Sequence, residues 1–246
     1  PRYRSSAASD VYKRQLALLV LLGLAGASIG GLMTWHHDVQ MFGDASLQGG
    51  LIGCEASEEV NCDIVNTSEY SEFLGVPIAT WGIATYLLVA GLAGLAAAGR
   101  QAMLKIILVI GVGATLYSGF LFGVSKQLLN YVCAWCMRLY GINIAIPVLA
   151  LLAGAWSAPK PAGRTIGSAL GAFVLLSALS VGGERAFRST LLGEEATQTR
   201  LVEATPEATP EPAGPKLDPE GVLTARTMEV TTEDKNKATL HVRPDD

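Results

Sequence analysis

Long apolar runs separated by short polar segments dominate the pattern of this chain. A helix that rises about 1.5 Å per residue needs about 20 apolar residues to cross the hydrocarbon core of a bilayer. Runs close to that length lie at 16–33, 78–98, 103–124, 136–156 and 165–183. The pattern therefore predicts an all-α membrane protein, with a four-helix transmembrane bundle plus a fifth transmembrane helix.

The polar segments set the expected boundaries. Near the C-terminus, the stretch ATPEATPEPAGPKLDPEG is rich in Pro, Glu and Thr, so it cannot bury enough apolar area to fold. A short alternating run, Ala238–Val242, is too isolated to predict a strand. The expected parts are a basic N-terminus at 1–15, left out of the fold prediction; a four-helix domain at 16–156 with an outer loop at 34–77; the fifth helix at 157–183; and an acidic, Pro-rich, disordered tail at 184–246.

Composition agrees with a membrane location. Half of the residues are hydrophobic and 16% are charged, whereas soluble domains carry about 25% charged residues. The net charge is −4, so no basic face is available to neutralise the phosphates of a nucleic acid. We expect membrane lipid, and no nucleic acid, among the partners.

The distribution of Lys and Arg predicts the orientation. Basic residues precede the first run and lie between the second and third and between the fourth and fifth runs, whereas 33–77 contains eight acids and no Lys or Arg. Basic connections stay in the cytoplasm. We therefore expect a multi-pass protein of the bacterial inner membrane, with its cysteines on the oxidising, periplasmic side.

The four cysteines form two pairs, and both pairs lie at the edges of apolar runs. Cys54 and Cys62 are eight residues apart in the acidic loop, which is long enough to move a sulfur. Cys133 and Cys136 form a CAWC motif where the fourth run begins; at a helix start both sulfurs share one face, and the helix amino end stabilises a thiolate. The spacing predicts that Cys133 exchanges with other thiols and that Cys136, one turn deeper, faces a membrane-soluble oxidant.

Two other interpretations fit the cysteines alone. The first is a non-enzymatic membrane scaffold held by two static disulfides, Cys54–Cys62 and Cys133–Cys136. The second is a transition-metal site formed by the thiolates with His36 or His37. Thiolate-rich sites buried against lipid are uncommon, and zinc requires four tetrahedral ligands, so we expect no metal.

The cysteines and their surroundings resemble the vitamin K epoxide reductase family, specifically its bacterial homologues that oxidise thioredoxin-like proteins with quinone. The resemblance covers about 16–156. The loop cysteines have the family's eight-residue offset, and Ser68 stands where the family carries a functional Ser or Thr. The segment Gly75-Val76-Pro77 leads into the second run, which is another feature typical of the family. In the second motif, CAWCMRLYGIN, Tyr140 matches the family's quinone-side tyrosine.

The resemblance implies a relay of electrons. Cys54 exchanges with a thioredoxin-like periplasmic protein, Cys62 passes the electrons to Cys133, and Cys136 reduces ubiquinone or menaquinone, with Ser68 and Tyr140 near the quinone. Asn143, one turn below Tyr140, is a further candidate to donate a hydrogen bond to a quinone carbonyl. No cysteine follows Cys136, so we expect the partner to come from solution. Family members also use these cysteines to reduce vitamin K epoxide; an outward-facing relay favours disulfide formation instead.

Overall fold

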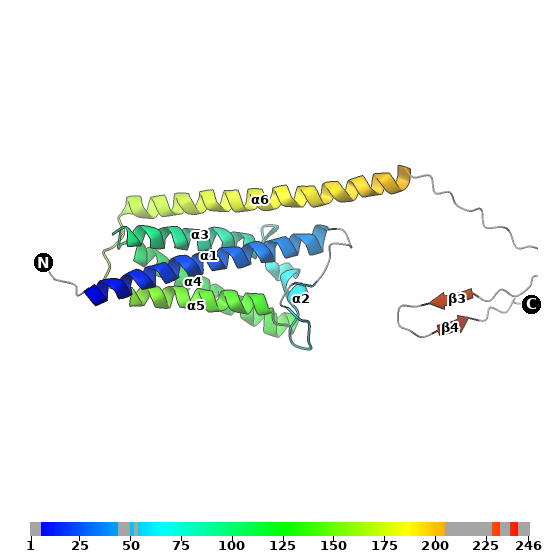
Figure 1. Cartoon of the computed structure of the whole chain (residues 1–246), viewed down its shortest axis with the longest axis horizontal. Coiled ribbons are helices and arrows are strands. Elements are labelled where there is room, and N and C mark those ends of the chain that lie inside the picture. The colour runs from blue at the N-terminus through cyan, green and yellow to red at the C-terminus, as the bar shows by residue number, and fades with distance from the viewer. Residues whose placement is uncertain (1–5, 44–49, 52–53, 205–227, 232–236, 241–246) are drawn as a thin grey trace, which may run out of the picture. The chain divides into compact units, whose positions relative to one another are not determined.

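The computed structural model describes residues 6–43, 50–51, 54–204, 228–231 and 237–240. Within these residues, five helices are long and apolar enough to cross a membrane. They are α1 (Ser6–Phe42), α3 (Ile78–Ala97), α4 (Met103–Val124), α5 (Ala134–Leu152) and α6 (Gly163–Ala204), drawn in Figure 1. The predicted class, an all-α membrane protein with a four-helix bundle and a fifth helix, is confirmed.

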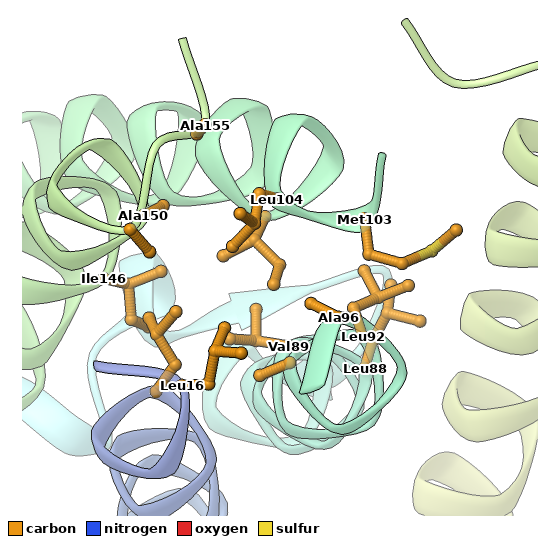
Figure 2. Packing of buried hydrophobic residues seen from close by; sticks show 14 of the residues in the cluster. Leu16, Leu88, Val89, Leu92, Ala96, Met103, Leu104, Ile146, Ala150 and Ala155 are labelled. Atoms are coloured by element: carbon orange, nitrogen blue, oxygen red, sulfur yellow. The ribbon is translucent and has the colours of Figure 1, made fainter. Parts of the chain in front are cut away.

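Helices α1, α3, α4 and α5 pack around an apolar core, with α1 lying along α3 and α4 along α5. Figure 2 shows one region of this core, to which each helix contributes a buried aliphatic side chain: Leu16 from α1, Val89 from α3, Leu104 from α4 and Ile146 from α5. Lipid tails are as apolar as these side chains, so in a membrane the hydrophobic effect provides little drive for helix association. Close packing must therefore hold the four helices together.

Glycines on two helices permit that packing. A Cβ atom added at Gly26 of α1 would lie 2.6 Å from the ring of Tyr86, and one at Gly23 would lie 2.8 Å from the Tyr86 carbonyl oxygen. On α4, a Cβ atom at Gly111 would lie 2.8 Å from the ring of Pro147. Any side chain at these positions would push neighbouring helices apart, so the helix contacts depend on glycine.

Short elements fill the end of the bundle where α1 ends and α5 begins, which we call the cysteine end (Figure 1). The elements between α1 and α3 are α2 (Cys62–Asn66), the 3-10 turn η1 (Glu69–Ser71) and the antiparallel strands β1 (Glu72–Phe73) and β2 (Val76–Pro77). The hairpin turn between the strands places Leu74 and Gly75 at φ values of 56° and 69°, a left-handed conformation that glycine adopts without strain. After α4, the π-helical turn η2 (Ser125–Leu129) leads toward α5.

Helix α1 continues beyond the boundary predicted for it. The outer loop was expected to begin at 34, but α1 runs to Phe42; it also begins at Ser6, inside the N-terminal part left out of the prediction. With 37 residues the helix is about 55 Å long, well beyond a hydrocarbon core of about 30 Å. Its last turns contain polar residues that hydropathy assigns to a loop, although the fold buries Thr34, His37 and Asp38.

The expectation of disorder after 183 is wrong for part of the tail. Helix α6 extends to Ala204, and strands β3 (Met228–Thr231) and β4 (Lys237–Leu240) pair antiparallel. The described part of the helix reaches to two residues before Pro206, the first proline after 163. The Pro-rich stretch itself lies outside the described residues. The chain forms two compact units, 1–199 and 200–246, and the paired strands belong to the second.

Candidate redox site

A short backbone pairing brings the two cysteine pairs together at the cysteine end. Val60 and Val132 form a parallel bridge: the amide of Asn61 donates to the carbonyl oxygen of Val132 (3.1 Å), and the amide of Val132 donates to that of Glu59 (2.8 Å). Cys62 directly follows Asn61, and Cys133 directly follows Val132. Both are buried in one apolar cluster, which Cys54 and Cys136 also contact. The loop pair and the CAWC pair therefore meet in a single site.

The two pairs differ in redox state. Cys54 and Cys62 form a disulfide, whereas Cys133 and Cys136 are free thiols. Cys54 is half-buried and lies next to the exposed Glu55, while Cys62 is buried. The scaffold interpretation requires a disulfide in each pair, and the structure contains the first. Cys54 is thus the more accessible sulfur of the bonded pair.

Cys133 lies at the amino end of α5, where its surroundings stabilise a negatively charged sulfur. Its sulfur accepts a hydrogen bond from the amide of Cys136 (3.2 Å) and caps the helix. The pKa of Cys133 is lowered, chiefly by the hydrogen bond from the Cys136 thiol and further by the amides of Cys136 and Trp135 and the charge of Arg138; burial opposes this shift. The Arg138 guanidinium itself lies over the Trp135 ring, 4.1 Å from its centre. A thiolate at Cys133 is therefore favoured.

A cavity of 390 Å³ opens beside Cys136. This volume is within the range of small-molecule pockets, and most of the lining side chains are apolar. The cavity brings together four residues singled out in the sequence: Ser68, Cys136, Tyr140 and Asn143. An apolar, ring-shaped quinone fits such a lining, and the inner thiol of the CAWC motif would face it.

Hydrogen bonds within the protein fix the orientation of several polar side chains in the cavity. Tyr86 donates to Asn143 Oδ1 (2.8 Å), and Asn143 Nδ2 donates to Ser118 Oγ (2.8 Å). The Ser68 hydroxyl donates to the carbonyl oxygen of Val65 (2.9 Å). The Asn143 amide is therefore oriented by the protein, with one N–H left beyond the hydrogen bond to Ser118.

The hydroxyl of Tyr140 has no hydrogen-bond partner among the residues that the structure describes, so it can donate to a ligand. Tyr86, Tyr117 and Ser118 also line the cavity and were not predicted from the sequence. Their polar atoms within apolar runs were the available signal, because polar groups at membrane depth usually have a partner or a function.

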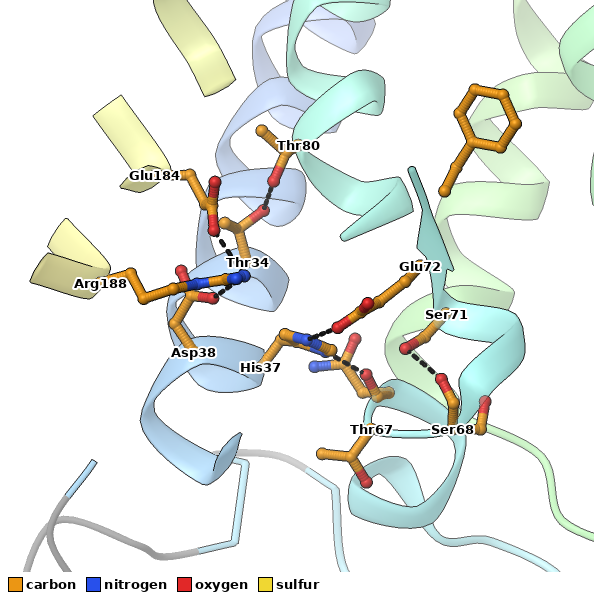
Figure 3. Close-up of polar contacts among 12 residues, drawn as sticks. Thr34, His37, Asp38, Thr67, Ser68, Ser71, Glu72, Thr80, Glu184 and Arg188 are labelled. Atoms are coloured by element: carbon orange, nitrogen blue, oxygen red, sulfur yellow. Dashed lines mark hydrogen bonds and ion pairs between the residues drawn. The ribbon is translucent and has the colours of Figure 1, made fainter. Parts of the chain in front are cut away.

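A polar cluster next to the site joins α1 to the short elements (Figure 3). His37 contacts the carbonyl oxygen of Asn66 (Nδ1, 2.6 Å) and the carboxylate of Glu72 (Nε2, 3.0 Å). Asn66 is the last residue of α2, whose first residue is Cys62. Within the described residues no group of three or more His, Cys, Asp or Glu could hold a metal ion. His37, one of the two histidines considered as metal ligands, contacts both α2 and β1.

A disulfide-bonded loop pair lies beside a free dithiol at one end of a membrane bundle and next to an apolar cavity, an arrangement that fits a membrane thiol–disulfide oxidoreductase. The model of the vitamin K epoxide reductase family matches residues 17–151. The match spans more than half of the chain, and the protein belongs to this family. No curated protein matches the sequence.

Proposed function

We propose that the protein reoxidises a thioredoxin-like periplasmic protein and passes the electrons to a membrane quinone, and thereby supports disulfide bond formation. The observation that carries this proposal is the pairing of Asn61 with Val132, which sets Cys62 beside Cys133 while Cys136 lines a ligand-sized cavity. This order of sulfurs is what a relay from solution to lipid requires.

The first exchange takes place at the loop pair. A thiolate of the reduced partner attacks Cys54 and releases Cys62 as a thiolate. The second partner thiol then displaces Cys54, so the partner leaves as a disulfide and the loop pair as a dithiol. The half-buried position of Cys54 supports its role as the sulfur that the partner reaches.

The second exchange takes place between the pairs. The Cys62 thiolate attacks Cys133 in an oxidised Cys133–Cys136 disulfide, and Cys136 leaves. Cys54 then attacks Cys62, which re-forms the loop disulfide and frees Cys133 with two electrons stored in the CAWC dithiol. The lowered pKa of Cys133 makes it a good leaving group in this step.

The cavity residues serve the last transfer. A quinone, bound as ubiquinone or menaquinone, would accept two electrons and two protons from the dithiol and become a quinol as the Cys133–Cys136 disulfide re-forms. The Tyr140 hydroxyl and the remaining amide hydrogen of Asn143 would donate hydrogen bonds to the carbonyl oxygens of the quinone, and Ser68 lines the same cavity.

Orientation and location form part of the proposal. The absence of Lys and Arg from 33–77 supports a periplasmic cysteine end in a bacterial inner membrane. Labelling of intact cells with a membrane-impermeant thiol reagent after mild reduction tests this orientation. Modification of Cys54 before lysis supports it, and modification only after lysis contradicts it.

Quinone turnover is the direct test. The purified protein, a reduced thioredoxin-like protein and a soluble quinone analogue are mixed, and quinone absorbance is followed. We expect quinol to form with one partner disulfide per quinol, and any Cys→Ala change among the four cysteines to abolish the coupling. Full turnover by a Cys136→Ala variant would remove Cys136 from the role proposed here.

A static scaffold is the second candidate, because the Cys54–Cys62 disulfide is also what a stapled loop would contain. A Cys62→Ala variant separates the two functions. In a relay it accumulates a reducible mixed disulfide between Cys54 and the partner, visible as a band of higher mass. If trapping yields no such band, the scaffold is favoured.

A further inference from the structure

A second cavity lies between α3 and α6, at the end of the bundle opposite the cysteine end. Its volume is about 870 Å³, within the range of small-molecule pockets. Helix α3 ends here, and α4 and α6 begin here (Figure 1). This cavity shares no lining residue with the one beside Cys136, so the proposed electron transfer leaves it without a role.

The walls of this cavity are apolar over a length that matches one leaflet of a bilayer. They are formed by side chains of both helices: Leu88, Leu92 and Leu95 from α3, and Ala169, Ala172 and Leu176 from α6. Figure 2 shows Leu88 and Leu92 beside Met103 of α4, which also lines the cavity. The α6 wall, from 165 to 176, is about 16 Å long at about 1.5 Å per residue, close to half of a hydrocarbon core of about 30 Å. An alkyl chain of one leaflet therefore fits between the two helices.

Small residues on both helices keep the space open. Gly91 of α3 lines the cavity, and a Cβ atom added there would meet nothing within 4 Å. On the facing side of α6, Ala169 and Ala172 present only methyl groups, whereas the larger Leu170 and Val174 are exposed and do not line the cavity. An apolar space of this kind inside a membrane takes up hydrocarbon in preference to water.

The mouth of the cavity is polar and basic. Arg100 and Gln101 line it where α3 ends, and Thr165 and Ser168 line it in the first turns of α6. Within the described part of the chain, the Arg100 guanidinium has neither a hydrogen-bond partner nor a counter-ion. The sequence from 73 to 183 contains no Asp or Glu, so the walls supply no negative charge. The mouth therefore offers an unpaired cation above an apolar space.

We propose that this cavity binds an anionic phospholipid, with an acyl chain between α3 and α6 and the phosphate on Arg100. A guanidinium binds phosphate oxygens through two parallel N–H donors, and the Gln101 amide and the Thr165 hydroxyl lie at the same mouth to add neutral ones. Basic pockets between transmembrane helices are typical sites for anionic headgroups. A zwitterionic headgroup brings its own ammonium group toward Arg100, so it binds less tightly.

The bound lipid would attach α6 to the bundle at this end. The backbone of α6 makes few close approaches to the other helices. Farther along α6, Arg188 is paired with Asp38 of α1 at 3.2 Å (Figure 3). The ion pair and the lipid would thus hold two different parts of the same helix.

The headgroup is tested by lipid titration. The full-length protein in detergent is mixed with phosphatidylglycerol or with phosphatidylcholine of the same acyl chains, and bound lipid is followed by native mass spectrometry. We expect one phosphatidylglycerol per protein, bound about tenfold more tightly than phosphatidylcholine. Arg100→Gln should weaken phosphatidylglycerol binding about tenfold, as for the loss of one charge-assisted hydrogen bond. Arg14→Gln, which removes the same charge from an exposed position of α1 outside the cavity, is the matched control and should bind unchanged.

The acyl chain is tested by filling the cavity. Gly91→Leu places a side chain in the open space and should weaken the binding of both lipids. Gly94→Leu is the control, because Gly94 lies on the same helix, also faces open space and does not line the cavity. Thermal unfolding without lipid shows that both variants fold. A phosphatidylglycerol with a photoreactive group in its acyl chain should label peptides from 87–95 and 165–176.

Several results would overturn the proposal. Equal affinity for the two lipids would show ordinary solvation of the helices by the bilayer, and labelling outside the two segments would place the lipid elsewhere. Displacement of phosphatidylglycerol by inorganic phosphate would leave a site for a free anion only. Displacement by a quinone analogue, or a lipid-free dimer that prevents labelling, would assign the cavity to a quinone or to a second copy of the chain. None of these measurements uses the cysteines, so the lipid site stands or falls separately from the proposed function.

Discussion

The main-chain amide of Asn61 donates to the carbonyl oxygen of Val132 across 3.1 Å, and the next residue on each side is a cysteine. This contact joins a loop that follows the first helix to the segment that precedes the fourth helix of the bundle. It fixes Cys62 next to Cys133 in a buried apolar cluster. Exchange between the two pairs therefore requires local motion of sulfur atoms rather than a large movement of the loop.

The Asn61 side chain caps the helix that carries Cys62. Its Oδ1 accepts from the amide of Ile64 (3.0 Å). Asn61→Ala removes this cap and should destabilise α2 by about 1 kcal/mol, so Cys62–Cys133 cross-linking by oxidised glutathione in a Cys54→Ala/Cys136→Ala variant should slow. Asn61→Ser retains a capping oxygen and should restore most of the rate; equal rates for the two variants would contradict a role for the cap.

Cys133 should ionise below the ordinary cysteine pKa, which is about 8.5. Between its lowered pKa and that value, Cys133 is a thiolate while an ordinary cysteine is still protonated. Cys136→Ala removes the main cause of the shift, so the pKa should rise, whereas Cys136→Ser keeps a donor and should hold it low. Ultraviolet thiolate absorbance against pH, in a variant lacking Cys54 and Cys62, measures this; identical curves for the Ala and Ser variants would refute the assigned cause.

The hydroxyl of Tyr86 should affect quinone binding through Asn143. Tyr86→Phe leaves Asn143 Oδ1 without its donor at 2.8 Å, so the amide can rotate and its remaining N–H is no longer aimed. We expect KM for quinone to rise several-fold with a smaller change in kcat, as for the loss of one neutral hydrogen bond of about 1 kcal/mol. Cys62–Cys133 cross-linking serves as the control and should be unaffected; a selective loss there would show that Tyr86 acts elsewhere.

Gly26 should be sensitive to the smallest substitution. In Gly26→Ala the new methyl group would meet the Tyr86 ring at 2.6 Å, and such overpacking destabilises by about 1–3 kcal/mol. Gly31→Ala, on the same helix, meets nothing within 4 Å and should be neutral or slightly stabilising. Thermal unfolding in detergent compares the two; equal midpoints would mean that α1 and α3 do not pack closely at Gly26.

The sequence predicted helix boundaries well where they depend on a continuous local run of apolar residues. The α3 boundaries, Ile78–Ala97, differ from the expected 78–98 by one residue, because the hydrocarbon core imposes a long apolar run. The same criterion failed for the end of α1. His37 and Asp38 are polar, so hydropathy assigns them to a loop, whereas the fold buries them among partners from α2, β1 and α6.

The sequence by itself determined the number of spanning helices, the spacing of the cysteines and the residues to inspect around them, because each depends on the chemistry of neighbouring residues. Tertiary structure alone decided that Asn61 pairs with Val132, that Tyr86 orients Asn143 and that both nitrogens of His37 face acceptors. These contacts join segments far apart in the chain. They form because helix packing removes certain polar groups from water. Each buried polar group then needs a hydrogen-bond partner within the protein.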